Sequence, residues 1–301
     1  MGKKSIIYAI MGVVLLSLVV IFFFFNHPIK SNEKTISATF FPIKEITSAV
    51  VGDKFKVVSV IPDGVEPHDY EPTTEDIKNM HNSIVLFGLG LEFSDIEKNL
   101  ASTNPSIQYI VLSDNLSLLK PSAALIEEDK SLVYDPHVWN SFKDMIQMTK
   151  KVRDEMIKID PSNSDYYSKN ADAYLSKLTD LDNNFSTELK NCKTRTIFTS
   201  HAAFAYLAQD YNLTQFAISG LTPDAEPNPQ KLKELVDLAK TNNITYIFYE
   251  ELVDPRVSET IAREIGAKTL ELSPEEGSKD GRDYITIMED NLKNLKIALS
   301  C

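Results

Sequence analysis

The stretch SNSDYYSKNADAYLSKLTDLDNNFSTEL, Ser162 to Leu189, decides how this chain is organised. Its apolar side chains recur at the spacing of one helix face, from Tyr167 through Leu178 to Phe185. The pattern predicts one amphipathic helix of about 28 residues, roughly 40 Å long. An ordinary core helix has the same pattern, so the flanking segments must show what this helix joins.

Short strand-like runs alternate with helix-like segments on both sides of this stretch. Residues 83–87 (SIVLF) are an example before it, and residues 246–249 (YIFY) are one after it. Such alternation predicts two α/β domains with mostly parallel sheets. We therefore expect an N-terminal α/β domain over residues 31–160, the long helix over 161–190 and a C-terminal α/β domain over 191–301.

The N-terminus begins with a positively charged and then apolar pattern. Lys3 and Lys4 precede Ile6–Phe25, a run without charged residues. As a helix, this run of about 20 residues would span about 30 Å, the thickness of the hydrocarbon layer. A cleaved signal peptide usually has a shorter apolar region and a small-residue cleavage site. We expect residues 1–30 to be an uncleaved transmembrane anchor and linker, with the remaining chain on the extracytoplasmic face of the cell membrane. A cleaved signal peptide is the alternative.

Composition and charge bound the class of protein. The chain has 301 residues, 43% of them hydrophobic and 25% charged, which is ordinary for a globular protein large enough for two domains. The formal net charge of −12 argues against a nucleic-acid partner, which requires a basic face. The same charge is compatible with attracting cations.

The chain contains two cysteines, Cys192 and Cys301. In an extracytoplasmic protein an isolated pair predicts one disulfide. Both residues flank the predicted C-terminal domain, which favours a bridge between them. Two unrelated thiols are the alternative.

Three of the five histidines lie in distinctive segments. His68 lies in PDGVEPHDYEP, a loop that three prolines stiffen and in which Asp69 is the expected acceptor for an imidazole N–H. His137 lies in YDPHVW, and His201 lies in IFTSHAAFAYLA directly after a strand-like run. The long gaps between them exclude a zinc finger and suit a site built from the ends of several strands. A surface loop with an incidental histidine is the alternative for each.

Four motifs together carry a resemblance to a known family: GVEPHDYEPTTEDI (64–77), DPHVW (135–139), SHAAFAYLA (200–208) and LTPDAEPNPQKL (221–232). From Thr35 to Cys301 the chain resembles the zinc- and manganese-binding solute-binding proteins of ABC importers, the cluster A-I lipoprotein and adhesin-like family. The resemblance implies that the long helix joins the two domains and limits hinge motion. It also implies a monomer that binds a metal ion in the interdomain cleft, delivers it to an ABC permease in the membrane and catalyses no reaction.

The resemblance further implies a fourth ligand from the loop LSPEEGSKDG, residues 272–281. Many relatives have an aspartate where this chain has Ser273. Zinc-type relatives carry an Asn-Pro-Leu-Glu pattern, and its match here points to Glu276. Glu275 and Asp280 remain the other candidates.

The expected ligands His68, His137, His201 and Glu276 indicate which metal is bound. Three imidazoles and one carboxylate suit Zn²⁺, whereas Mn²⁺ sites favour more oxygen ligands. Mn²⁺ binding is the nearest alternative. A zinc-dependent hydrolase is a further one, with a water as fourth ligand and Glu276 as general base, but the chain has no HExxH motif.

Overall fold

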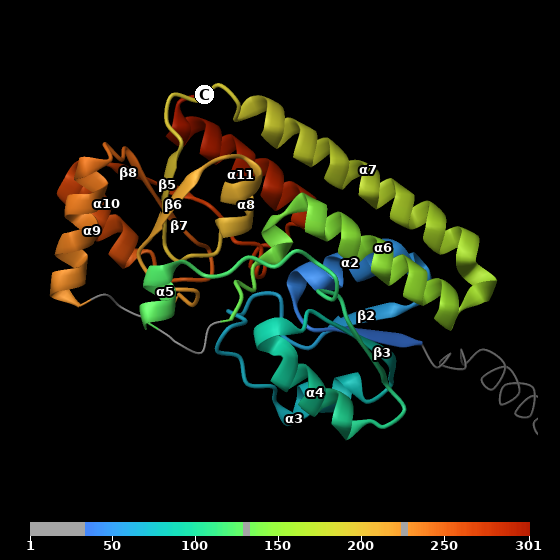
Figure 1. Ribbon diagram of the computed structural model, residues 1–301. Helices are drawn as coiled ribbons and strands as arrows, with labels where there is room; N and C mark the ends of the chain where they lie inside the picture. The colour runs from blue at the N-terminus through green and yellow to red at the C-terminus, as the bar shows by residue number, and fades with distance from the viewer. Residues whose placement is uncertain (1–33, 129–132, 224–227) are drawn as a thin grey trace, which may run out of the picture. The chain divides into compact units, whose positions relative to one another are not determined.

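The long helix is present as α7, Ser164–Glu188, in the computed structural model of the protein (Figure 1). The structure describes residues 34–128, 133–223 and 228–301. Tyr167, Leu178 and Phe185 are buried on one face of α7, as their spacing predicts. The helix packs against α2 (Phe41–Val51) and α6 (Phe142–Ile159), and also against α11 (Tyr284–Leu299). It therefore contacts both the N-terminal half, residues 34–160, and the C-terminal half, residues 191–301.

The N-terminal half contains a four-stranded parallel sheet in the order β2-β1-β3-β4. All four residues of β1 are buried, as expected for an inner strand of a parallel sheet that is covered on both faces. Helix α3 begins with a reciprocal capping box formed by Thr73 and Asp76. The elements are β1 Thr35–Ala38, β2 Lys56–Ser59, α3 Thr74–Met80, β3 Ser83–Gly88, α4 Ser94–Thr103, β4 Gln108–Val111 and α5 Ala123–Glu128.

The C-terminal half has two pairs of parallel strands, β5 with β6 and β7 with β8. β5 lies beside β7, so the two pairs are neighbours (Figure 1). The α/β class with parallel sheets is thus confirmed in both halves. The elements are β5 Thr196–Thr199, α8 Ala205–Asp210, β6 Thr214–Ala217, α9 Pro229–Thr241, β7 Tyr246–Tyr249, α10 Arg256–Ile265 and β8 Lys268–Glu271.

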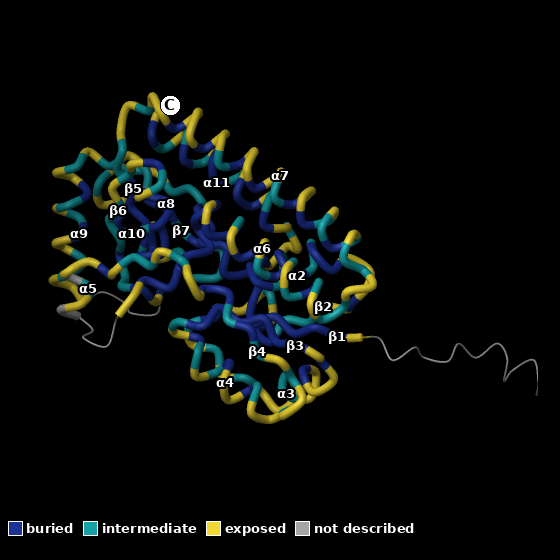
Figure 2. Tube along the Cα trace, turned by 45° about the vertical axis from the view of Figure 1, so that its right-hand side comes forward, coloured by how far each residue is buried: buried dark blue, intermediate teal, exposed yellow. Residues whose placement is uncertain are grey.

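One hydrophobic core crosses from half to half. The same cluster of buried side chains includes Trp139 from the N-terminal half and Phe204, Leu272 and Tyr284 from the C-terminal half. Figure 2 shows the buried segments of this core between the two groups of strands. Residues 34–301 form one compact unit, and their division into domains at the boundaries given above stays a prediction.

The predicted disulfide joins Cys192 to Cys301. Cys192 lies between α7 and β5, and Cys301 directly follows α11. The bridge therefore ties the end of the chain to the start of the C-terminal half, where the main-chain N of Thr194 also donates to Leu299 O at 3.2 Å.

No helix within residues 34–128, 133–223 and 228–301 is both long and apolar enough to cross a membrane. The predicted anchor, Ile6–Phe25, and its linker lie outside the described residues.

Candidate metal centre

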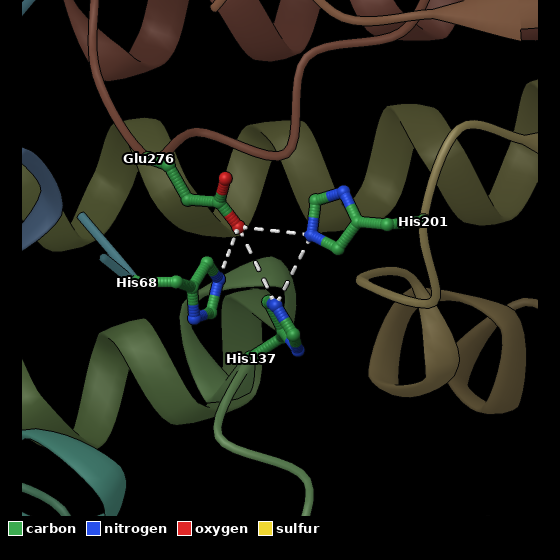
Figure 3. Close-up of side chains that lie close together, drawn as sticks. All are labelled: His68, His137, His201 and Glu276. Atoms are coloured by element: carbon green, nitrogen blue, oxygen red, sulfur yellow. Dashed lines mark hydrogen bonds and ion pairs between the residues drawn. The ribbon is translucent and has the colours of Figure 1, made fainter. Parts of the chain in front are cut away.

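The ends of several strands bring the predicted ligands together. His68 lies in the loop that follows β2, and His201 lies two residues beyond β5. His137 precedes a short 3-10 turn, Val138–Asn140, and Glu276 lies in the loop after β8. Their side chains point toward one another (Figure 3). All four are buried, so the group is withdrawn from bulk water.

The four ligand atoms form a compact cluster, all within 4.8 Å of one another. Glu276 Oε1 lies 3.3 Å from His68 Nε2, 3.4 Å from His137 Nε2 and 3.3 Å from His201 Nε2. The Nε2 atoms of His137 and His201 are 3.4 Å apart. In a tetrahedral zinc site with bonds of about 2.0–2.1 Å, neighbouring ligand atoms are about 3.3–3.4 Å apart. These four distances therefore fit one Zn²⁺ ion bound within the cluster.

A carboxylate lies next to the Nδ1 atom of each imidazole. Asp135 Oδ1 is 2.8 Å from His137 Nδ1, and both oxygens of Glu250 are 2.8 Å from His201 Nδ1. Asp135 and Glu250 each accept the Nδ1 proton of their ring, so these two rings keep Nε2 free to bind a metal. The same carboxylates also accept from the main-chain N–H of their histidines, at 2.9 Å and 3.2 Å.

The partner of His68 differs from the predicted one. Glu92 Oε1 lies 2.9 Å from His68 Nδ1, whereas Asp69 is exposed while the His68 side chain is buried. The expectation that Asp69 sets the tautomer of His68 is therefore wrong. Glu92 reaches the ring because the turn before it takes left-handed backbone angles, φ 79° at Gly90 and φ 54° at Leu91.

Glu97 holds that turn in place. Its buried carboxylate accepts from the main-chain N–H groups of Leu89 and Gly90, both at 2.8 Å. It also accepts from Thr39 Oγ1 and the Tyr109 hydroxyl, both at 2.6 Å. A fully buried carboxylate with four donors is a structural support, and here it supports the segment that carries Glu92.

The charges of the cluster balance one another when no metal is bound. Burial lowers the pKa of His201, but Glu250 and Glu276 outweigh it and raise that pKa to about 10. Burial also lowers the pKa of His68, but Glu92 and Glu276 outweigh it and hold that pKa well above its usual value. Burial raises the pKa of Glu276, but the histidines outweigh it and hold that pKa well below its usual value. A metal ion would therefore have to displace protons from the imidazoles in order to bind.

The loop after β8 places its three candidate ligands, and the nearby Ser273, differently. Glu276 joins the cluster, while Glu275 is fully buried and its oxygens have no hydrogen-bond partner among the described residues. Asp280 pairs with Arg282 at 2.7 Å. Ser273 Oγ accepts from the main-chain N–H of Glu275 at 3.2 Å. Of these residues only Glu276 has an oxygen in the cluster.

Three carboxylates near the cluster had no role in the sequence-based prediction. Glu92 is the last residue of the segment GLGLE, residues 88–92, and Glu250 directly follows β7. The position of Glu250 at a strand end was the available signal. Glu66 Oε1 accepts from the main-chain N–H of His68 at 3.0 Å and lies 4.0 Å from its Nε2. Burial and the nearby Glu276 raise the pKa of Glu66 to about 7.

Comparison with known proteins agrees with this geometry. Residues 36–298 match the family described as zinc-uptake complex component A, periplasmic. The high-affinity zinc uptake system protein ZnuA of Bacillus subtilis (strain 168) is 37% identical over 286 residues, which cover 90% of this chain and 89% of that protein. The zinc-binding protein AdcA of Streptococcus pyogenes serotype M1 is 34% identical, and the match covers 87% of this chain and 55% of AdcA.

A solved structure gives the same result. The Zn(II)-bound ZnuA-like domain of Streptococcus pneumoniae AdcA superimposes with a TM-score of 0.76 at 34% identity, covering 89% of this chain and all of that domain. The resemblance predicted from the four sequence motifs is thereby confirmed. By the match over residues 36–298, the chain belongs to the zinc-uptake complex component A family.

Proposed function

We propose that the protein is the extracytoplasmic solute-binding component of an ABC importer. It binds Zn²⁺ through His68, His137, His201 and Glu276 and delivers the ion to its permease. The observation that carries the proposal is the spacing of the four ligand atoms, with Glu276 Oε1 at 3.3–3.4 Å from three imidazole nitrogens. That spacing supports a four-coordinate zinc ion held by protein side chains alone.

Binding rather than catalysis follows from this ligand set. Four protein ligands fill a tetrahedral coordination shell, so no position is left for the water that a zinc hydrolase activates. Family membership agrees, because the family is one of zinc-uptake components and its members are solute-binding proteins, not enzymes.

The same ligand set favours zinc over manganese. Imidazole suits zinc, whereas manganese prefers oxygen ligands and six-coordinate geometry. Three of the four ligand atoms here are nitrogen. The carboxylates behind the rings, Asp135, Glu250 and Glu92, make the imidazoles stronger donors, as they do in many zinc sites.

The proposal includes how the protein is placed in the cell. The uncleaved anchor over Ile6–Phe25 would hold residues 34–301 outside the membrane, next to the permease. The two α/β domains would act as a monomer without a nucleic-acid partner. Mass spectrometry of the membrane fraction tests the anchor, because a chain that begins after residue 25 would indicate a cleaved signal peptide.

Metal titration of the soluble fragment from Ser31 tests the ligand assignment. Substitution of His68, His137 or His201 by Ala should each weaken zinc binding at least about tenfold, about 1.4 kcal/mol. His81→Ala is the matched control, because this exposed histidine at the end of α3 lies outside the cluster. A variant of the three that binds zinc as tightly as the unmodified protein would remove that residue from the proposed site.

A further inference from the structure

The two loops that carry His68 and Glu276 touch each other directly. The main-chain N–H of Ser278 donates to Asp63 O at 2.6 Å. Asp63 lies in the His68 loop of the N-terminal half, and Ser278 lies two residues beyond Glu276 in the C-terminal half. This contact therefore fixes how closely the two halves of the cluster approach each other.

Gly277 lies at the point of contact. A Cβ atom added at Gly277 would lie 2.2 Å from Asp63 O and 3.2 Å from Asp63 C. It would also lie 3.0 Å from Leu252 Cδ1, a side-chain atom that can move. The backbone of Gly277 is not in the left-handed region, since its φ is not among the positive values. Space against the Asp63 main chain, not backbone conformation, is what this position requires.

The Asp63 segment is held from behind and has little freedom to retreat. Lys44 in α2 forms an ion pair with the Asp63 carboxylate. Pro62 restricts the backbone directly before Asp63, and the main-chain N–H of Val65 closes a turn onto Pro62 O at 3.0 Å. A side chain at position 277 would therefore move the Glu276 loop outward instead.

The size of that movement is large for a metal site. Bringing a Cβ from 2.2 Å to ordinary contact at 3.4 Å or more requires a separation of about 1 Å. Metal–ligand distances in a working site stay within about 0.2 Å of their usual values. Glu276 is the residue next to Gly277, so its carboxylate would leave the position 3.3 Å from His68 Nε2.

We propose that Gly277 is a positioning residue of the metal centre: its missing side chain allows the Glu276 loop to close on the His68 loop. The inference rests on the proposed function, because it concerns the affinity of the same four-ligand site. It adds a second requirement for tight binding besides the ligands themselves, namely the close approach of the main chains at Gly277 and Asp63.

Gly277→Ala tests the inference, with Gly64→Ala as the matched control. Gly64 lies in the same His68 loop, next to Asp63, and an added Cβ there meets nothing within 4 Å. We expect Gly277→Ala to weaken zinc binding at least about tenfold and Gly64→Ala to change it less than about twofold. Equal affinity of Gly277→Ala and the unmodified protein would overturn the inference. Absence of zinc binding by the unmodified protein would instead overturn the proposed function.

A double-substitution cycle separates a role at the metal from a general loss of stability. If Gly277 acts through Glu276, Gly277→Ala should cost less than about twofold in a Glu276→Gln background. The circular dichroism and thermal midpoint of the metal-free protein should be unchanged by Gly277→Ala. The same fold-loss in both backgrounds, or a metal-free variant that does not fold, would assign Gly277 to the fold and overturn the inference.

Discussion

Substitution of Glu250 by Gln tests whether the carboxylates behind the imidazoles set the strength of the metal site. Glu250 is only 3% exposed, and both of its oxygens lie 2.8 Å from His201 Nδ1. Gln has the same size and keeps one oxygen that can accept the Nδ1 proton. The ring therefore stays in place, and the main change is the loss of one negative charge.

The magnitude follows from two opposing effects. Loss of a carboxylate behind a metal-binding histidine typically costs about 10- to 100-fold in affinity, about 1.4–2.7 kcal/mol. Burial lowers the pKa of His201, but Glu250, together with Glu276, outweighs it and raises that pKa to about 10. A proton therefore competes with zinc throughout the neutral range. Glu250→Gln releases that proton more easily. We expect a loss of about tenfold near pH 7 that grows as the pH rises.

Zinc competition with a chromophoric chelator between pH 7 and 8.5 measures both the loss and its pH dependence. Glu251→Gln is the matched control, because the adjacent Glu251 pairs with Arg282 at 3.1 Å and, among the described residues, is not part of the four-ligand cluster. Unchanged affinity of Glu250→Gln at every pH would refute the reasoning. An equal loss in Glu251→Gln would refute it too, since that result would point to a general effect of charge.

Three further outcomes are expected. Zinc affinity should rise steadily from pH 5 to 8, because the pKa of His201 in the metal-free protein is about 10 and protons leave as pH increases; a flat profile in calorimetric titrations would contradict histidine ligation. Thiol titration of the denatured, unreduced protein should find Cys192 and Cys301 blocked, and reduction should lower the free energy of unfolding by up to about 4–5 kcal/mol. Glu276→Gln should weaken zinc binding at least about tenfold while Glu275→Gln leaves it within about twofold, and the reverse order would make Glu275 the ligand.

The three candidate histidines could be singled out from sequence because histidine is rare in this chain, whereas Glu276 was implied only by the family resemblance. Three of the five histidines follow strand-like runs or prolines, and parallel strands deliver such residues to a common edge. The pH window could not be predicted in the same way. An ordinary histidine pKa near 6.5 predicts loss of affinity only below that pH. The pKa of about 10 that Glu250 and Glu276 give His201, against the opposing effect of burial, predicts a dependence that continues above pH 7.

The partners of His68 and His201 could not be predicted, because they depend on loops that approach in space. Asp69 is next to His68 in sequence, yet Glu92 is the residue at its ring. The approach requires left-handed backbone at Gly90 and Leu91, and a hydrophobic pattern carries no information on that turn. The need for Gly277 is hidden for the same reason, since its neighbour Asp63 lies far away in the chain.

The shared core bears on how a bound metal could leave. Trp139 is fully buried between the halves, where its Nε1 donates to Pro274 O at 2.7 Å and its carbonyl accepts from the Tyr284 hydroxyl at 2.8 Å. Separating the halves would expose both aromatic rings, each at a cost of about 1.5–3 kcal/mol, and break these bonds.

The loop after β8 contains a residue, Glu275, whose backbone conformation and burial are both unfavourable. Glu275 takes a left-handed φ of 63° and buries a carboxyl group that has no hydrogen-bond partner among the described residues. Both features cost free energy, and exposing this carboxyl group to water would relieve the second. Displacing this loop, with Glu276 on it, would break the bonds that Trp139 donates to Pro274 O and that Ser278 donates to Asp63 O. Relief of the buried Glu275 carboxyl group would offset part of that cost.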